Sequence, residues 1–219
     1  MRILCLHGFR QCALTFSEQC KGLNDALGDA GRRGFELEFL DAPFLFKETR
    51  AGRPEQRLWW LASDDGSEYR GWEESVECVK KHLRSSQSGV DGLLGFSQGA
   101  AFATVLAALK QEGDTDLKSV RFVLLFSAFP AREPDLWGKV SRACLGLPSL
   151  HISSEHDKLL PAEAATIVAD AFDPSSRQIV LHSEGHRIPR DSAVLSKIRT
   201  FLESVLADLG QSFTRTMNG

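Results

Sequence analysis

Short apolar segments alternate with segments of helical periodicity along almost the whole chain. Most of the apolar segments are continuously hydrophobic, which is typical of strands buried on both faces. Strands are predicted at residues 2–6, 36–40, 92–95, 121–126, 149–153 and 177–181. Helices are predicted at about 15–30, 72–83, 98–110, 161–171 and 193–209. This order predicts an α/β fold in which a mostly parallel sheet of about six strands carries helices on both faces.

Length and composition narrow the classes of protein to which the chain can belong. With 219 residues, 42% of them hydrophobic and a net charge of −3, the chain fits one soluble domain and shows no sign of nucleic-acid binding. No apolar stretch is long enough to span a membrane. The five cysteines form no C-x-x-C pair or zinc-site pattern, which favours reduced thiols and a cytoplasmic location.

The least regular region lies at about residues 44–71 and is interpreted as a loop-rich or small helical insertion beside the carboxyl ends of the strands, where sites in such sheets lie. It is rich in aromatic residues, and Phe129 follows a later predicted strand. One interpretation is that these rings line an apolar cleft that binds substrate; the other is that they form the insertion's own small core. The residues expected at the cleft are Trp59, Trp60, Tyr69 and Phe129, and one of the two adjacent tryptophans is expected to face it.

Residues 95–99, GFSQG, match the G-x-S-x-G nucleophile elbow. In such an elbow the serine, here Ser97, occupies a strained turn between a strand and a helix, and the glycines avoid collisions with neighbouring backbone. An apolar strand precedes these residues and an alanine-rich helix follows them, as the motif requires. The alternative is a serine that only caps the helix.

A serine hydroxyl is a weak nucleophile until a base accepts its proton, so a histidine and an orienting carboxylate are needed. Hydrolases with this elbow carry them in the order Ser, Asp or Glu, His. Asp157 follows the predicted strand 149–153, and His186 lies between the last predicted strand and the last helix. Ser97, Asp157 and His186 are therefore predicted to meet at the carboxyl edge of the sheet as a catalytic triad.

Other residues compete for these roles. His182 ends the last predicted strand and is the alternative base, and Glu155 is the alternative acid. The remaining histidines considered fall within predicted elements or beside the acid and are interpreted as structural or loop residues: His82, His151 and His156.

Acyl transfer also needs hydrogen-bond donors for the oxyanion. The N–H of Gln98, directly after the serine, is one expected donor. The other should come from the loop after the first strand, where His7 and Gly8 let the N–H of Phe9 face the site. A tight turn without catalytic function is the alternative interpretation of that His-Gly pair.

Several motifs follow one another from ILCLHGFRQ through LDAPF, RLWW, YRGWEES, GFSQGAAFA, FSAFPAR and SLHISSEHDKLLP to EGHRIP. Together they resemble the family serine hydrolases of the α/β-hydrolase superfamily over nearly the whole chain. The resemblance implies an α/β-hydrolase fold over residues 1–219, the triad Ser97, Asp157 and His186, and the oxyanion donors Phe9 and Gln98. It also implies hydrolysis of carboxylic esters or thioesters.

Three positions depart from the family pattern. Ala128 and Ser154 stand where glycine is common, and Glu184 stands where the first of two glycines is usual. None of them removes a catalytic group. Glu184 is the most consequential, because a carboxylate two residues before His186 could raise the pKa of the imidazole or compete with Asp157 for its proton.

The predicted function is a serine esterase, or thioesterase, that acts on small-molecule substrates with medium or long acyl or alkyl chains. The chemistry proceeds through an acyl-enzyme and requires no metal or organic cofactor. A binding module that keeps the fold without turnover is the alternative function. A nucleotide enzyme is disfavoured, because the chain lacks a Walker A loop and a G-x-G-x-x-G motif after its first strand.

Overall fold

The computed structural model describes residues 1–28, 34–46, 52, 54–86 and 89–217, and the side chains up to residue 208. Its centre is a six-stranded parallel sheet with the strand order β10-β9-β8-β7-β1-β2. The strands are β1 (Arg2–Leu6), β2 (Glu36–Leu40), β7 (Gly92–Phe96), β8 (Phe122–Phe126), β9 (Ser149–Ser154) and β10 (Arg177–His182). The six strands predicted from the apolar segments are confirmed to within one residue at each end.

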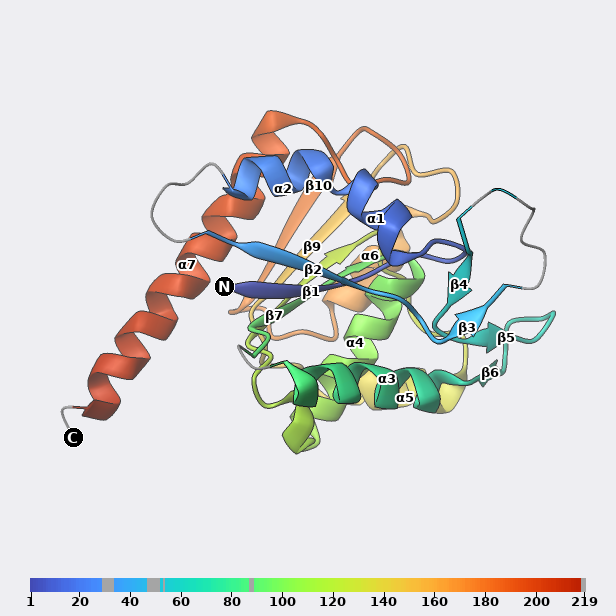
Figure 1. Cartoon of the computed structure of the whole chain (residues 1–219), viewed down its shortest axis with the longest axis horizontal. Helices are drawn as coiled ribbons and strands as arrows, with labels where there is room; N and C mark the ends of the chain where they lie inside the picture. The colour runs from blue at the N-terminus through green and yellow to red at the C-terminus, as the bar shows by residue number, and fades with distance from the viewer. Residues whose placement is uncertain (29–33, 47–51, 53, 87–88, 218–219) are drawn as a thin grey trace.

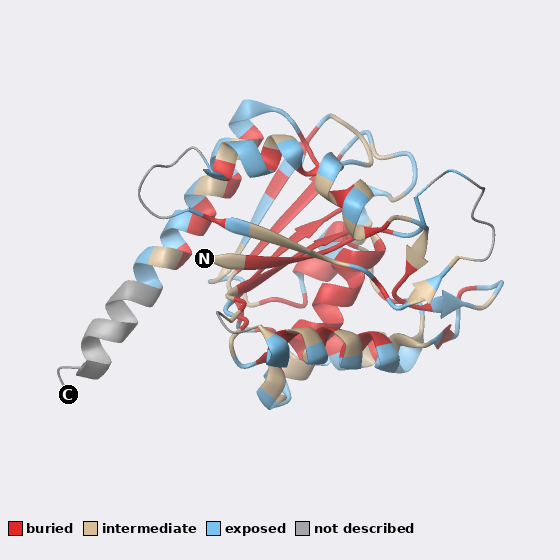
Figure 2. Cartoon of the chain, viewed as in Figure 1, coloured by how far each residue is buried: buried red, intermediate tan, exposed pale blue. Residues whose placement is uncertain are grey.

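The interior strands are buried along almost their whole length, with Arg2 at the start of β1 partly exposed, which explains their continuous hydrophobic character. Every residue of β7, β8 and β9 is buried, whereas the edge strand β10 exposes Ile179 and Leu181. Figure 2 shows the buried strands between two layers of helices. The expected parallel sheet with both faces covered is confirmed.

Helices cover both faces of this sheet (Figure 1). The apolar residues of α1 (Ala13–Gln19), α2 (Lys21–Gly28) and α7 (Ser192–Met217) pack on one face. Those of α3 (Trp72–Ser85), α4 (Gln98–Gln111), α5 (Pro134–Arg142) and α6 (Ala162–Ala169) pack on the other. None of the described helices is both long and apolar enough to cross a membrane.

Three helical features differ from the prediction. The last helix, α7, was predicted to end at about residue 209 and continues to Met217. The helix expected at 15–30 is divided into α1 and α2, with Cys20 between them. The sequence reading also missed α5, which is short. It begins at Pro134, and the Glu133 carboxylate caps it by accepting hydrogen bonds from the N–H groups of Asp135 and Leu136.

The aromatic-rich region contains two small antiparallel sheets. β3 (Phe44–Leu45) pairs with β4 (Arg57–Leu58), and β5 (Leu61–Ala62) pairs with β6 (Tyr69–Arg70). The described residues of 44–71 contain no helix, so the possibility of a small helical insertion is wrong for this part of the chain. Strands of two residues are too short to produce a recognisable periodicity.

Candidate active site

Ser97 occupies the sharp turn between β7 and α4. Its φ of 52° and ψ of −116° place a non-glycine residue in a disfavoured region of backbone conformation. Although Ser97 is the N-cap residue of α4, its side chain makes no capping hydrogen bond. The geometry therefore favours the strained nucleophile elbow over the interpretation of Ser97 as a simple helix cap.

The two glycines of the elbow are required by close backbone approaches. A Cβ atom on Gly95 would lie 2.4 Å from the carbonyl oxygen of Gly99. A Cβ atom on Gly99 would lie 2.0 Å from the carbonyl oxygen of Leu6 in the neighbouring strand β1. Both distances are far below a normal contact, so any side chain at either position would force the elbow away from the sheet.

Asp157 and His186 lie in the loops after β9 and β10, and their side chains form a hydrogen bond. The Nδ1–H of His186 donates to Oδ2 of Asp157 over 2.6 Å. Oδ1 of Asp157 accepts from the N–H groups of Leu159 and Leu160 at 2.9 and 3.0 Å. Burial would raise the pKa of Asp157, but these hydrogen bonds outweigh it and hold that pKa below the ordinary value.

His186 and Ser97 face the same cavity, which has a volume of about 360 Å³. The ring of His186 packs on that of Phe96, the residue before the serine, with the ring centres 4.9 Å apart. Among the described residues no hydrogen bond links the Ser97 hydroxyl to His186, and such bonds are often long before substrate binds. The cavity is lined by Phe9, Gln11, Gln19, Phe96, Ser97, Phe129, Leu159, Leu160 and His186.

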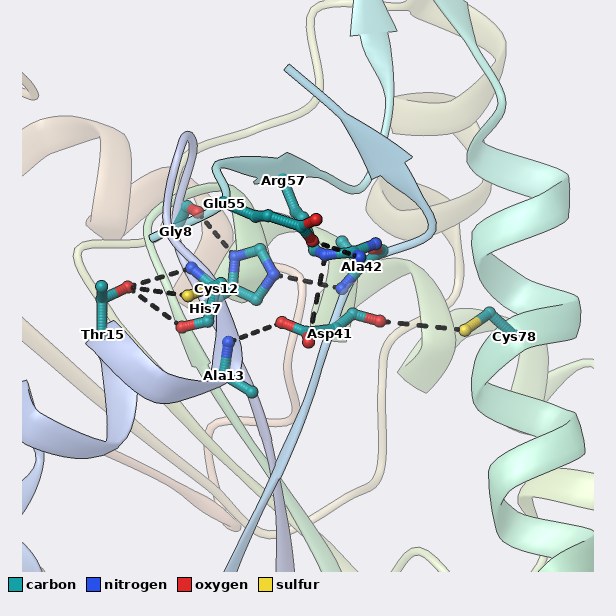
Figure 3. Close-up of polar contacts among 10 residues, drawn as sticks. All are labelled: His7, Gly8, Cys12, Ala13, Thr15, Asp41, Ala42, Glu55, Arg57 and Cys78. Atoms are coloured by element: carbon teal, nitrogen blue, oxygen red, sulfur yellow. Dashed lines mark hydrogen bonds and ion pairs between the residues drawn. The ribbon is translucent and has the colours of Figure 1, made fainter. Parts of the chain in front are cut away.

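The loop after β1 is held in one orientation by the buried side chain of His7 (Figure 3). Nε2 of His7 accepts from the Ala42 N–H at 3.1 Å, so Nδ1 carries the proton and donates to the Gly8 carbonyl at 2.8 Å. Burial lowers the pKa of His7, which favours this neutral form. In a trans peptide the C=O and N–H point in opposite directions, so the Phe9 N–H is directed away from His7.

Gln11 also fixes this loop through two hydrogen bonds to Gly8. Its N–H also donates to the Gly8 carbonyl at 3.2 Å, and its side-chain Oε1 accepts from the Gly8 N–H at 2.8 Å. Among the described residues no group accepts from the N–H of Phe9 or from that of Gln98. Both predicted oxyanion donors thus remain available to a ligand.

A family model described as serine hydrolase (FSH1) matches residues 1–198 of this chain. The match extends over the elbow, both loops and the first strand. The chain belongs to this serine hydrolase family. The resemblance seen in the sequence motifs is confirmed, and with it the assignment of the chain to the hydrolytic enzymes.

Known proteins agree with this membership. Esterase OVCA2 of Bos taurus is 34% identical over 210 residues, which cover 86% of this chain and 89% of that protein. The crystal structures of Arabidopsis thaliana SOBER1 and Zea mays acyl-protein thioesterase 2 are similar, each with a TM-score of 0.62 over 94% of this chain. They are 16% and 17% identical and are covered to 99% and 93% of their length, and they show the shared α/β-hydrolase fold.

Of the four aromatic residues expected at the substrate cleft, only Phe129 lines the cavity of this serine hydrolase. Trp59 and Trp60 are 0% and 3% exposed and belong to the core. Trp59 stacks on Phe102, and Trp60 stacks on Tyr69. The expectation that Trp59, Trp60 and Tyr69 line the cleft is therefore corrected, because these rings are packed against one another and against α4.

The backbone and indole polar groups of Trp59 and Trp60 can be buried because they form hydrogen bonds. The Gln98 amide accepts from the Trp59 N–H at 3.1 Å and donates to the Trp60 carbonyl at 3.2 Å. The indole N–H of Trp59 donates to the His7 carbonyl at 2.8 Å. The side chain of Gln98 therefore fastens the region 57–62 to the elbow, a role that the sequence reading did not assign to it.

The competing histidines have other partners. Nδ1 of His182 accepts from the Glu184 N–H, and Nε2 of His82 contacts Oε1 of Glu38 at 3.0 Å. His151 is buried beside Ser149 at 3.0 Å. None of these three rings lines the cavity at Ser97.

Glu184 and Glu155, the alternatives to Asp157 as partner of His186, have other partners or lie elsewhere. Glu184 accepts from the N–H groups of Arg190 and Asp191 through Oε1, at 2.8 and 2.9 Å. This carboxylate thus orders the chain entering α7. Glu155 lies on a different hollow, which it shares with His182. Asp157 is the carboxylate that contacts His186.

Sequence reasoning missed three contributors to the site. Leu159 and Leu160, directly after Asp157, form an apolar wall of the cavity. The hydroxyl of Ser154, a residue 1% exposed, accepts from the N–H groups of His156 and Gly185. The pattern DKLLP carried a signal for the leucines, because two apolar residues in an otherwise polar loop indicate a contact surface. Ser154 was noted only as a departure from the glycine common in the family, and nothing in the sequence indicated its hydrogen bonds.

Proposed function

We propose that this serine hydrolase cleaves carboxylic esters by nucleophilic catalysis with Ser97 as nucleophile, His186 as base and Asp157 as its orienting acid. The observation that carries the proposal is the 2.6 Å hydrogen bond between His186 and Asp157 at a cavity that Ser97 shares. The three residues come from loops at the carboxyl edge of the same parallel sheet.

The proposed mechanism moves one proton between Ser97, His186 and the leaving group. Asp157 holds the proton of His186 on Nδ1, so Nε2 is free to accept the proton of the Ser97 hydroxyl as its oxygen attacks the ester carbonyl. The N–H groups of Phe9 and Gln98 stabilise the negative oxygen of the tetrahedral intermediate. His186 then protonates the leaving alcohol, and a water molecule activated by the same base releases the acid from Ser97.

The cavity walls favour substrates with medium or long acyl or alkyl chains. Phe9, Phe129, Leu159 and Leu160 present apolar surface to the cavity beside Ser97. Phe9 is 54% exposed and Leu159 is 73% exposed, so the apolar surface continues onto the rim. A chain lying along this rim removes both side chains from water, which favours binding. The same chemistry applies to thioesters, whose thiol is the easier leaving group.

Labelling with a fluorophosphonate probe tests the nucleophile. We expect the wild-type protein to be labelled and the Ser97→Ala variant to remain unlabelled, with hydrolysis of p-nitrophenyl esters reduced by about 10⁶. Esters from acetyl to palmitoyl, with acyl-thioester counterparts, then define the chain preference. A folded wild-type protein that neither labels nor exceeds Ser97→Ala in turnover would identify a non-catalytic binding module instead.

A further inference from the structure

A second hollow adjoins the cavity at Ser97. It has a volume of about 340 Å³ and is lined by Gln19, His186, Arg187, Ile188 and Arg190. Gln19 and His186 line both hollows, so the two hollows adjoin at the histidine ring. The character of the walls changes from apolar at Ser97 to cationic beyond His186.

The two arginines of this hollow are exposed and carry uncompensated charge. Within the described part of the chain neither Arg187 nor Arg190 forms an ion pair. The carboxylates nearest in sequence are those of Glu184 and Asp191. Oε1 of Glu184 and Oδ1 of Asp191 each accept two backbone N–H groups, and neither carboxylate makes an ion pair with either guanidinium among the described residues. The side-chain oxygen of Gln19 accepts from Gln11 at 2.8 Å, which leaves the amino group of Gln19 as a further donor toward the hollow.

The position of this hollow relates it to one half of the substrate. In the proposed mechanism His186 protonates the leaving group, so the leaving group lies beside the imidazole. The cationic hollow contacts His186 but not Ser97, whereas the apolar residues Phe9, Phe129 and Leu159 line only the cavity at the serine. The acyl chain and the leaving group therefore face surfaces of different chemistry.

We propose that Arg187 and Arg190 form a subsite for an anionic group on the alcohol or thiol leaving group of the substrate. The inference rests on the proposed function, since it uses the role of His186 to orient the substrate. Guanidinium groups bind carboxylates and phosphates through charge-assisted hydrogen bonds, and the Gln19 amide adds a neutral donor. The backbone of both arginines is held by hydrogen bonds: the Glu184 carboxylate accepts from the N–H of Arg190, and the Gly185 carbonyl accepts from the N–H of Arg187.

Two substrates that differ in the charge of the leaving group measure the effect of that charge on turnover. Para-butanoyloxyphenylacetate and the corresponding acetamide share the same acyl group and a phenol of similar reactivity, because a methylene group separates the ring from the carboxylate or amide. The ratio of kcat/KM for the anionic to the neutral ester, corrected for their uncatalysed rates, is expected to be about 1.4 to 5 at low salt, as for an exposed ion pair. It should fall as ionic strength rises.

Variants then assign the preference to the arginines. The double variant Arg187→Gln/Arg190→Gln should bring the ratio to about 1, and Arg190→Glu should turn it below 1 through repulsion. Arg70→Gln is the matched control: its side chain is 81% exposed and lies on β6, outside both hollows, so the ratio should be that of the wild type. Fluorophosphonate labelling confirms that each variant is folded and competent.

The outcomes separate this inference from the proposed function. A wild-type ratio near 1, or a ratio that both arginine variants leave unchanged, would overturn the anionic subsite while leaving Ser97 as nucleophile. If Ser97→Ala instead hydrolysed the neutral ester as fast as the wild type, the proposed mechanism itself would be wrong. A salt-sensitive preference that Arg190→Glu reverses supports the subsite.

Discussion

The hydroxyl of Ser154, the last residue of β9, lies 3.0 Å from the backbone nitrogen of Gly185 in the loop after β10 and accepts its hydrogen bond. The same hydroxyl accepts from the N–H of His156 at 3.1 Å. Gly185 precedes His186, and His156 precedes Asp157. One buried oxygen at the end of β9 therefore connects the backbone of the acid to the backbone of the histidine.

Replacing Ser154 by alanine should lower both stability and turnover. The variant leaves two N–H groups without their buried acceptor, which costs about 1–3 kcal/mol in the free energy of unfolding. With the two loops no longer tied, kcat should fall more than KM changes, because the distance between His186 and Asp157 is no longer fixed. Urea unfolding and steady-state kinetics measure the two effects.

Ser153→Ala is the matched control for this variant. Ser153 is a buried residue of the same strand, and its hydroxyl makes no hydrogen bond to the described residues. The Ser153→Ala variant should retain the wild-type kcat. Equal losses of kcat in the two variants would show that the Ser154 hydroxyl does not position the catalytic loops.

Replacing Asp157 by asparagine should reduce kcat by about 10³–10⁴, because the neutral amide no longer stabilises the charged imidazole or fixes its tautomer. The folded state also loses stability near neutral pH. Since the pKa of Asp157 is held below its ordinary value, the carboxylate stabilises the fold above the ordinary aspartate range, and this contribution disappears as pH falls through the lowered value. The stability curves of variant and wild type should therefore converge in acid.

Steady-state rates and urea unfolding between neutral and acid pH provide the test. Glu155→Gln is the control, because Glu155 lines another hollow. A rate loss in Glu155→Gln as large as that in Asp157→Asn would assign the orienting acid to Glu155.

Two glycine-to-alanine substitutions should have opposite effects on stability. At Gly99 the added methyl group would meet the Leu6 carbonyl oxygen at 2.0 Å, so β1 and α4 must separate. We expect a loss of about 3 kcal/mol or more, with loss of fluorophosphonate labelling. At Gly28, the last residue of α2, no atom of the described residues lies within 4 Å of the added Cβ. Gly28→Ala should stabilise the fold by about 0.4–1 kcal/mol.

Thermal unfolding compares these glycine variants directly. Retention of wild-type labelling and stability by Gly99→Ala would mean that the elbow does not require the close approach to β1. The Gly28→Ala variant shows in the same experiment that an added methyl group is harmless where space exists.

The strands and the elbow could be predicted because their causes are local. A strand buried on both faces must be apolar throughout, and the turn at Ser97 requires small residues two positions away on each side. The order of Asp157 and His186 along the chain was also readable, since parallel strands bring their carboxyl ends to one edge. Each of these features depends on the residue types at fixed spacing.

The positions of the tryptophans could not be predicted, because they depend on partners distant in the sequence. Trp59 can be buried because the Gln98 amide and the His7 carbonyl accept hydrogen bonds from its two N–H groups. Neither contact can be inferred from the sequence around residue 59. The hydrogen bond from Gly185 to Ser154 likewise joins residues far apart in the sequence, and no sequence pattern predicts it. Residues in an irregular region can face either the core or a cleft, and tertiary hydrogen bonds decide which.

His151 should make the protein sensitive to acid. The residue is 1% exposed, and burial together with the nearby charge of Arg177 lowers its pKa from 6.5 to about 3. Between these values the unfolded chain binds a proton that the folded protein excludes. The contribution of neutral His151 to stability is therefore complete above about pH 6.5 and is lost progressively as pH falls, by up to about 1.4 kcal/mol per pH unit.

The variant His151→Phe removes this titration and should flatten the dependence of unfolding free energy on pH between about 6 and 4. Its absolute stability near neutral pH is not the decisive quantity, because the Ser149 hydroxyl also loses its partner at 3.0 Å. Ser149→Ala serves as the control, since it removes that hydrogen bond but keeps the imidazole and hence the steep slope. Urea unfolding at several pH values gives both slopes. If wild type and His151→Phe lost stability in parallel as pH fell, the acid sensitivity would have to arise from other groups, such as His7 and His182, whose pKa values are also lowered by burial.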